Sequence, residues 1–170
     1  MGFSRIRKRL PYLALAAAVV ALDRVTKSSI ASGMALHDAK VVVDGFFNLV
    51  HTRNTGIAFS LFADSDPVVK TYLIPLLSAA AVALVGYLFW SAGPLNWRSL
   101  TSLTLILAGA AGNLYDRFLY GYVTDFLDFY IGSYHWPAFN VADSAITTGA
   151  ALLLLESFGA SRAETDSNPA

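Results

Sequence analysis

The chain has 170 residues, of which 55% are hydrophobic and only 14% are charged, and its mean hydropathy is +0.52. Because soluble domains carry about 25% charged residues, most of this surface is expected to face lipid rather than water. A net charge of zero gives no argument for a nucleic-acid partner, and the lack of cysteine excludes disulfides, thiolate nucleophiles and zinc–thiolate sites.

Four apolar segments follow one another along the chain, each close to the roughly 20 residues that cross about 30 Å of hydrocarbon. They cover residues 11–30, 68–92, 99–119 and 138–158. We therefore expect an all-α integral membrane protein, a bundle of four transmembrane helices that forms a single domain over residues 1–160. The third segment contains small residues that let helix backbones approach closely. They are Ala108, Gly109, Ala111 and Gly112.

Basic residues before the first segment set the expected orientation. They are Arg5, Arg7, Lys8 and Arg9. By the positive-inside rule this cluster holds the N-terminus in the cytoplasm, and four spans return the C-terminus to the same side. The N-terminal sequence also resembles a secretory signal peptide. An uncleaved first helix is favoured, because Asp23, Arg24 and Lys27 follow without a clean small-residue cleavage site.

Two segments between the spans, residues 31–67 and 120–137, are expected outside, on the outer face of the membrane. The first is rich in Val, Phe, Ile and Thr and is broken by turn residues, which predicts a small β-sheet over about residues 40–62. The second is expected to form a loop or helix between the third and fourth spans. Residues 161–170 are polar and predict a disordered cytoplasmic tail.

Asp143 lies about one turn inside the fourth apolar segment and shares a helical face with Asn140, Ser144 and Thr147. An Asp at the centre of a membrane costs about 2.5–3.5 kcal/mol, and less near the interface, so such residues are functional candidates. The alternative is a structural Asp that bonds Asn113 across the bundle. The functional interpretation is favoured.

Asp23 and Asp116 differ from Asp143 because each is followed directly by an arginine, Arg24 and Arg117 respectively. A nearby cation lowers the pKa of a carboxyl group and keeps it ionised. Such an Asp is a good scaffold and a poor proton-sharing catalyst. We therefore expect both to have structural roles.

Asp125 and Asp128 have no basic neighbour in the sequence, and apolar surroundings would raise the pKa of whichever one turns inward. Either could instead be an ordinary charge facing water, which is the favoured interpretation for Asp128. One external loop joins Asp125 to Asp143, so both belong to the same membrane face. Two carboxyls about 3 Å apart cannot both ionise, so they share one proton. One carboxyl then activates a water while the other donates to the substrate carbonyl. This is the chemistry of aspartic proteases.

Other hydrolytic designs have weaker support. The chain has no HExxH motif, and His37, His51 and His135 are scattered, so no metal site is expected. It has no GxSxG elbow for a serine nucleophile. No cofactor is expected either.

Five motifs occur in order along the chain: DRVTK (23–27), NTGIAFS (54–60), GNLYDR (112–117), VTDF (123–126) and FNVADS (139–144). Together with the four predicted spans, they resemble the bacterial lipoprotein signal peptidases, the signal peptidase II family. The resemblance covers nearly the whole chain, from about residue 10 to residue 158. Any one motif alone is weak, but five in register are specific.

The resemblance implies an aspartic endopeptidase of the bacterial inner membrane. It would cleave the signal peptide from diacylglyceryl-modified prolipoproteins just before the lipidated cysteine, at the periplasmic face. The catalytic pair carried over by the motifs is Asp125 and Asp143. The other polar motif residues are implied to bind substrate or support the site. They are Asp23, Lys27, Asn54, Asn113, Asp116, Arg117 and Asn140.

Within this implied shell, Arg117 is expected to pair with Asp116, and Asn54 to meet the substrate backbone or the catalytic pair. The expected partners are lipid-modified prolipoproteins and membrane lipid, with no nucleic acid, and a monomer is expected. A transporter or assembly subunit is the main alternative from another class. It is disfavoured because the chain shows no inverted repeats and its polar clusters gather on one face. A presenilin-like or prepilin-peptidase-like protease is disfavoured because neither Asp lies in a GxGD motif.

Overall fold

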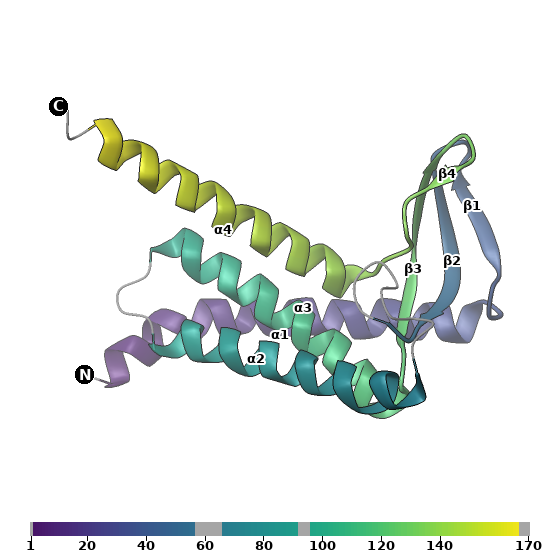
Figure 1. Ribbon diagram of the computed structural model, residues 1–170, viewed down its shortest axis with the longest axis horizontal. Coiled ribbons are helices and arrows are strands. Elements are labelled where there is room, and N and C mark those ends of the chain that lie inside the picture. The colour runs from purple at the N-terminus through teal and green to yellow at the C-terminus, as the bar shows by residue number, and fades with distance from the viewer. Residues whose placement is uncertain (1, 57–65, 92–95, 167–170) are drawn as a thin grey trace.

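The computed structural model describes residues 2–56, 66–91 and 96–166, which form four long helices and a four-stranded antiparallel sheet (Figure 1). The helices are α1 (Gly2–Gly33), α2 (Ile74–Ser91), α3 (Trp97–Tyr120) and α4 (Val141–Asp166), and a π-helical turn, η2 (Val69–Leu73), leads into α2. The strands are β1 (Ala39–Val43), β2 (Phe47–Asn54), β3 (Val123–Ile131) and β4 (Tyr134–His135). A helix thus occupies most of each apolar segment predicted from the sequence.

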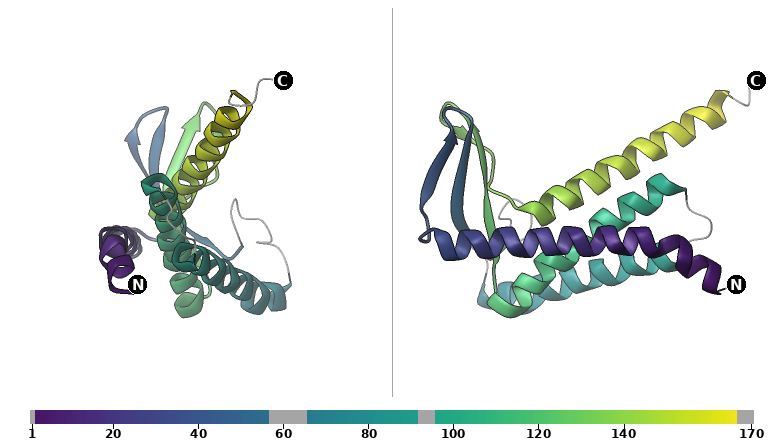
Figure 2. Two further views of the ribbon diagram at one scale, coloured as in Figure 1. Left: turned by 90° about the vertical axis from the view of Figure 1, so that its left-hand side faces the viewer. Right: turned by 180° about the vertical axis from the view of Figure 1, so that it is seen from behind.

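The helix α3 is the centre of the bundle, because it packs against α1, α2 and α4. The helices α1 and α2 contact α3 from different sides, and α4 diverges from the other helices towards its C-terminal end (Figure 2). The sheet lies across one end of the helices, whereas the start of α1 and the end of α4 lie at the other end (Figure 1). The two ends of the described chain are therefore on the same side, remote from the sheet.

Close contact of α3 with its neighbours depends on two of the predicted small residues. A Cβ atom on Gly109 would lie 2.3 Å from the backbone oxygen of Ala142 in α4, and one on Gly112 would lie 2.8 Å from the Asp23 carboxylate in α1. Neither distance leaves room for a side chain. The expected close approach of helix backbones is therefore confirmed at both positions.

Among the described residues, Val69–Ser91 and Val141–Phe158 are long and apolar enough to cross a membrane, by length and composition alone. Large apolar side chains on both segments are exposed, including Leu76, Leu84 and Leu155. Contact with lipid accounts for such surfaces better than contact with water does. The helices α1 and α3 also have the length for a crossing but carry buried charged side chains.

The sheet has the order β1-β2-β3-β4, and the β2–β3 pair joins distant segments of the chain, with Asn48 opposite Asp128, 80 positions away. The expected strand pair over residues 40–62 is confirmed as β1 and β2, and residues 57–62 lie outside the described chain. The expectation of a loop or helix over residues 120–137 is wrong, because this segment forms β3 and β4.

The local sequence explains the strands β3 and β4. Gly121 ends α3 in the left-handed conformation, with φ 74°. The sequence VTDFLDFYI is then rich in β-branched and aromatic residues, which favour a strand. Gly132, with φ 59°, permits the tight turn to β4. At the other end of the chain, α4 continues to Asp166 and so includes residues that were expected to be disordered.

Candidate functional site

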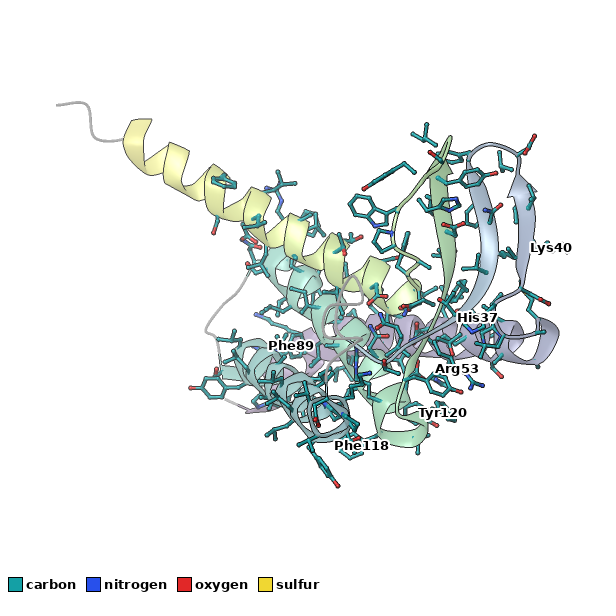
Figure 3. All side chains as sticks on the ribbon, turned by 45° about the vertical axis from the view of Figure 1, so that its right-hand side comes forward. His37, Lys40, Arg53, Phe89, Phe118 and Tyr120 are labelled. Carbon is teal, nitrogen blue, oxygen red and sulfur yellow. The ribbon has the colours of Figure 1, made fainter. Side chains whose placement is uncertain are left out.

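The site lies where the sheet meets the bundle, and β2, β3, α3, α4 and the residue before α4 contribute to it. Polar atoms gather at this junction in Figure 3, whereas Phe89 lies along the helices away from it. Asp125 comes from β3 and Asp143 from the first turn of α4. Three asparagines surround these carboxylates: Asn54 at the end of β2, Asn113 on α3, and Asn140 just before α4.

Asp125 is buried, with 2% of its surface exposed, and each of its carboxylate oxygens accepts one side-chain hydrogen bond. Asn140 Nδ2 donates to Oδ1 over 2.7 Å, and Asn54 Nδ2 donates to Oδ2 over 3.0 Å. Burial, followed by the negative charge of Asp143, raises the pKa of Asp125 to about 7, against the opposing effect of the two hydrogen bonds and of Lys27. Asp125 can therefore carry a proton near neutral pH, where an ordinary Asp is ionised.

Asp143 is the third residue of α4 and forms a reciprocal cap with Asn140. The Asp143 backbone N–H donates to Asn140 Oδ1 over 2.9 Å, and the Asn140 backbone N–H donates to Asp143 Oδ2 over 3.3 Å. Asn113 Nδ2 donates to Asp143 Oδ1 over 2.7 Å. The expected Asn113–Asp143 bond is therefore present. A position at a helix N-terminus also favours a negative charge on this side chain.

The orientation of the three asparagine amides follows from groups that can only donate. Lys27 Nζ donates to Asn113 Oδ1 over 2.8 Å, and the Gly56 backbone N–H donates to Asn54 Oδ1 over 2.9 Å. The Asp143 backbone N–H fixes Asn140 in the same way. Because each amide oxygen faces an obligate donor, each NH₂ group must face the other way, towards a carboxylate.

A buried ion cluster lies behind the asparagines. Lys27 Nζ lies 2.8 Å from Asp23 Oδ2 and 2.8 Å from Asp116 Oδ2, as well as 2.8 Å from Asn113 Oδ1. The other oxygen of Asp23 accepts the backbone N–H of Ala142 over 3.0 Å. The cluster therefore ties α1 to α3 and to the first turn of α4, which carries Asp143.

The ion pairs expected from sequence adjacency are wrong. Asp116 pairs with Arg24 and Lys27, and Asp23 pairs with Lys27. Arg117 instead donates from Nη2 to the Gly56 carbonyl over 2.7 Å. Consecutive residues on a helix point in different directions, whereas residues three or four apart share a face. The i,i+4 spacing of Asp23 and Lys27 is the sequence signal that could have identified Lys27 as the partner of Asp23.

Asp128 also differs from its expected place in water. It is 6% exposed, accepts a hydrogen bond from Asn48 Nδ2 over 2.9 Å, and lies 2.9 Å from His135 Nδ1. Side chains alternate along a strand, so Asp128 and Asp125 point to opposite faces of the sheet. Asp128 is buried but is turned away from Asp143. Neither Asn48 nor His135 was predicted to contact it.

A cavity of about 350 Å³ opens beside the carboxylates. Its walls include Asp143, Arg117 and two of the three asparagines, Asn54 and Asn113, together with apolar side chains such as Phe139. Asp125 forms no part of these walls but accepts a hydrogen bond from Asn54, which does. Among the described residues, no group of three or more His, Asp or Glu side chains could hold a metal ion. The arrangement places the buried carboxylate of Asp125 and the carboxylate of Asp143 next to a largely apolar cavity.

Comparison with known proteins points to one family. Residues 15–159 match the family model described as signal peptidase (SPase) II. A lipoprotein signal peptidase from Solibacter usitatus is 45% identical over 142 residues, which cover 84% of this chain and 87% of the relative. A lipoprotein signal peptidase from Desulforapulum autotrophicum is 47% identical over 131 residues, which cover 77% and 81%.

A solved structure has the same fold. It is described as a bacterial membrane enzyme structure at 2.3 Å resolution, and it superposes with a TM-score of 0.76 and 32% sequence identity, covering 88% of each chain. The helices and the sheet across their end are therefore shared with a membrane enzyme.

Proposed function

This chain belongs to the signal peptidase II family, and from that premise we propose that it is an aspartic endopeptidase that processes prolipoproteins. The proposed substrate is a prolipoprotein that carries a diacylglyceryl group on a cysteine. The proposed reaction hydrolyses the peptide bond just before that cysteine and releases the signal peptide. Relatives named lipoprotein signal peptidases over most of the chain support this substrate class.

The observation that carries the proposed mechanism is the placement of Asp125 and Asp143. Asn140 contacts both residues, and amide donors hold each carboxylate. With a pKa of Asp125 near 7, the pair holds one proton at neutral pH. Two acidic groups that share one proton are able to act as base and acid in the same step.

The reaction then follows from this protonation state. The ionised carboxylate removes a proton from a water, whose oxygen bonds to the scissile carbonyl carbon. The protonated carboxyl donates to the carbonyl oxygen, which gives a neutral tetrahedral intermediate. Collapse of that intermediate breaks the C–N bond. The proton taken from water passes to the leaving nitrogen, and a hydroxyl of the intermediate returns its proton to the other carboxylate as the new carboxyl group forms. The products are a new carboxyl group and a free amino group, and the pair regains its single shared proton.

The surroundings of the pair support a membrane-surface protease. The cavity beside Asp143 is mostly apolar, as an apolar signal peptide requires, and Arg117 lies in its wall as a charged donor. We propose that all four helices cross the inner membrane, that the sheet lies on the periplasmic face, and that both termini are cytoplasmic. The location of the sheet and of the two chain ends at opposite ends of the bundle is compatible with this topology (Figure 1).

The direct test uses purified protein in detergent with two precursors that differ only in the diacylglyceryl group. We expect cleavage of the lipid-modified precursor, with the new N-terminus at the modified cysteine as read by mass spectrometry. An aspartic mechanism predicts that Asp125→Asn and Asp143→Asn fail to cleave it. Failure of the wild-type protein to cleave the modified precursor would contradict the proposed function.

A further inference from the structure

A second cavity, the aromatic groove, lies on the sheet next to the candidate site. It has a volume of about 360 Å³ and is open to the surface. Its walls are almost entirely apolar and come from the β1–β2 turn, β3, β4 and the segment before α4. They are Phe46, Phe129, Tyr130, Ile131, Tyr134, Trp136 and Phe139. None of the five sequence motifs accounts for the groove except through Phe139.

The groove is continuous with the candidate site. Trp136 and Phe139 line both the aromatic groove and the cavity that contains Asp143. The strand β3 makes a second connection, because residues two apart on a strand lie on one face. Asp125, Phe129 and Ile131 therefore share a face of the sheet. At about 3.3 Å per residue, Phe129 lies about 13 Å along the strand from Asp125.

The face of the sheet that carries Asp125 also carries apolar side chains that lie opposite one another on neighbouring strands. Phe47 is opposite Phe129 in the register, and Tyr134 is opposite Ile131, so these four side chains lie on the groove face. On the other face, Asn48 and His135 both contact Asp128. The face that carries Asp125 therefore continues into paired apolar side chains, whereas the polar contacts of Asp128 lie on the other face.

The groove has a floor of packed aromatic rings and an exposed rim. The Phe129 ring stacks on Phe47 at 4.7 Å and on Phe139 at 5.8 Å, which fixes the floor of the groove. At its rim, Ile131 is 77% exposed and Tyr134 is 67% exposed. An exposed apolar surface of this kind marks a binding site for an apolar ligand.

We infer that the aromatic groove holds a fatty acyl chain of the substrate's diacylglyceryl group. This inference rests on the proposed function, in which the lipidated cysteine supplies the nitrogen of the scissile bond. The lipid is then attached within a few bonds of the reacting atoms, so its chains begin next to the cavity that contains Asp143. An acyl chain is apolar, unbranched and flexible, which suits an open groove with aromatic walls and no charged side chain.

The groove therefore helps to select and align the substrate. Binding of the chain along β3 places the cysteine near Asp125 and orients the scissile bond towards the carboxylates. An unmodified precursor lacks this contact. The site thus contributes to the preference for lipid-modified precursors, in addition to the recognition of the peptide.

The test compares two precursors with the same peptide, one with dipalmitoyl chains and one with dibutyryl chains. Ile131→Ser and Tyr134→Ser remove exposed side chains at the rim, away from the stacked floor. The matched control is Val41→Ser, because Val41 is 59% exposed and pairs with Asn48, on the opposite face of the sheet. Thermal unfolding checks that the three variants are folded.

Loss of contact with one buried methylene group weakens binding by about fourfold. We expect each rim variant to raise KM for the dipalmitoyl precursor by about fourfold or more, with kcat retained. KM for the dibutyryl precursor should change by less than about twofold, and Val41→Ser should behave as wild type with both. Equal changes for both precursors, or none for the dipalmitoyl one, would overturn the inference. Failure of the proposed function looks different, because the wild-type protein would then cleave neither precursor.

A second measurement locates the chain without catalysis. A dipalmitoyl precursor with a photoreactive diazirine at the end of its acyl chains is bound to the inactive Asp143→Asn variant and irradiated. We expect crosslinks to residues 129–136, identified by mass spectrometry, and their loss with a tenfold excess of unlabelled dipalmitoyl precursor. Crosslinks confined to the outward-facing side chains of α2, such as Leu76 and Leu84, would mean that the chains stay in the surrounding lipid, and would overturn the inference.

Discussion

Asn140 Nδ2 lies 2.7 Å from Asp125 Oδ1, and the same side chain accepts the backbone N–H of Asp143 through its oxygen. One amide therefore holds the strand β3 in register with the first turn of α4. Because the amide oxygen is committed to an obligate donor, its NH₂ group stays directed at Asp125. The two carboxylates cannot move independently, and the proposed mechanism depends on this coupling.

The first prediction concerns these two carboxylates as a unit. Asp125→Asn and Asp143→Asn should each abolish cleavage of a lipid-modified precursor, because each removes the shared proton site. The double variant should be hardly worse than either single one, since residues that act together are not additive. The control is Asp128→Asn on the same strand, whose side chain points to the opposite face; it should retain substantial activity. A fully active Asp125→Asn enzyme would contradict the mechanism.

The pKa of Asp125 predicts how activity depends on pH. The pair must hold one proton, and Asp125 loses it as the pH rises through about 7. We therefore expect kcat/KM to fall on the alkaline side with an apparent pKa near 7. Asn54→Ala should move this limb to higher pH, because the Asn54 hydrogen bond lowers the pKa of Asp125. It should also cost at least about tenfold in rate, or about 1.4 kcal/mol.

The same shift has a consequence for stability. A carboxyl whose folded pKa is raised stabilises the folded state below its unfolded pKa, near 4, and this contribution is lost as the pH rises towards 7. The asparagine side chain of the Asp125→Asn variant does not titrate, so the variant lacks this pH-dependent contribution. Its melting temperature, relative to wild type, should therefore increase between pH 5 and pH 8. If the difference in melting temperature between the variant and wild type stayed constant across this range, the pKa of Asp125 would not be raised in the folded protein.

The sequence predicts the helices well and the polar contacts only in part. Apolar segments near 20 residues have few alternatives to a helix, and all four were found in place. Small residues such as Gly109 were correctly linked to close packing, because no other feature of the sequence explains them. The motifs also brought Asp125, Asp143 and the asparagines to one place. These features follow from local patterns or from a specific resemblance.

The remaining features depend on contacts between distant parts of the chain. The strand β3 was missed because pairing with β2, far away in the sequence, decides its conformation. The partner of Asp116 was missed because Arg117 is its neighbour in sequence but not on the helix face, whereas Arg24 comes from α1. Burial of Asp128 likewise depends on Asn48. Register and helix orientation determine these contacts, and a single sequence does not specify either directly.

The ion cluster and Arg117 should respond differently to truncation. Lys27 is 2% exposed and lies between Asp23 and Asp116. Lys27→Ala therefore removes the ammonium group that pairs with both buried carboxylates. Loss of one partner of a buried pair costs about 3–5 kcal/mol, and we expect little folded protein. Arg117→Ala removes a hydrogen bond to the Gly56 carbonyl and should lower activity far more than stability. Melting temperatures and cleavage rates of both variants test this; equal losses of stability would contradict it.

The contact between α3 and α4 predicts the effect of added volume. An alanine Cβ at position 109 would lie 2.3 Å from the Ala142 backbone oxygen, so Gly109→Ala must push the helices apart. Overpacking of this kind costs about 1–3 kcal/mol, and it would also lengthen the Asn113–Asp143 bond. We expect a lower melting temperature and a large loss of activity. The matched control is Gly86→Ala on α2, whose Cβ would meet only Leu107 at 3.8 Å and should be tolerated.

The proposed topology predicts which positions are accessible from outside the cell. The chain has no native cysteine, so single cysteines can be introduced without interference. Asp44 and Ser133 lie in the turns of the sheet, whereas Ser91 ends α2 at the opposite end of the bundle. If all four helices cross the membrane with the sheet in the periplasm, Asp44→Cys and Ser133→Cys should react with a membrane-impermeant maleimide in intact spheroplasts. Ser91 is also exposed, so Ser91→Cys can react with the maleimide. Because this end of the bundle would face the cytoplasm, it should react only after the cells are lysed. Labelling of Ser91→Cys in intact spheroplasts would place both ends of the bundle in contact with the periplasm and would contradict the four-span arrangement.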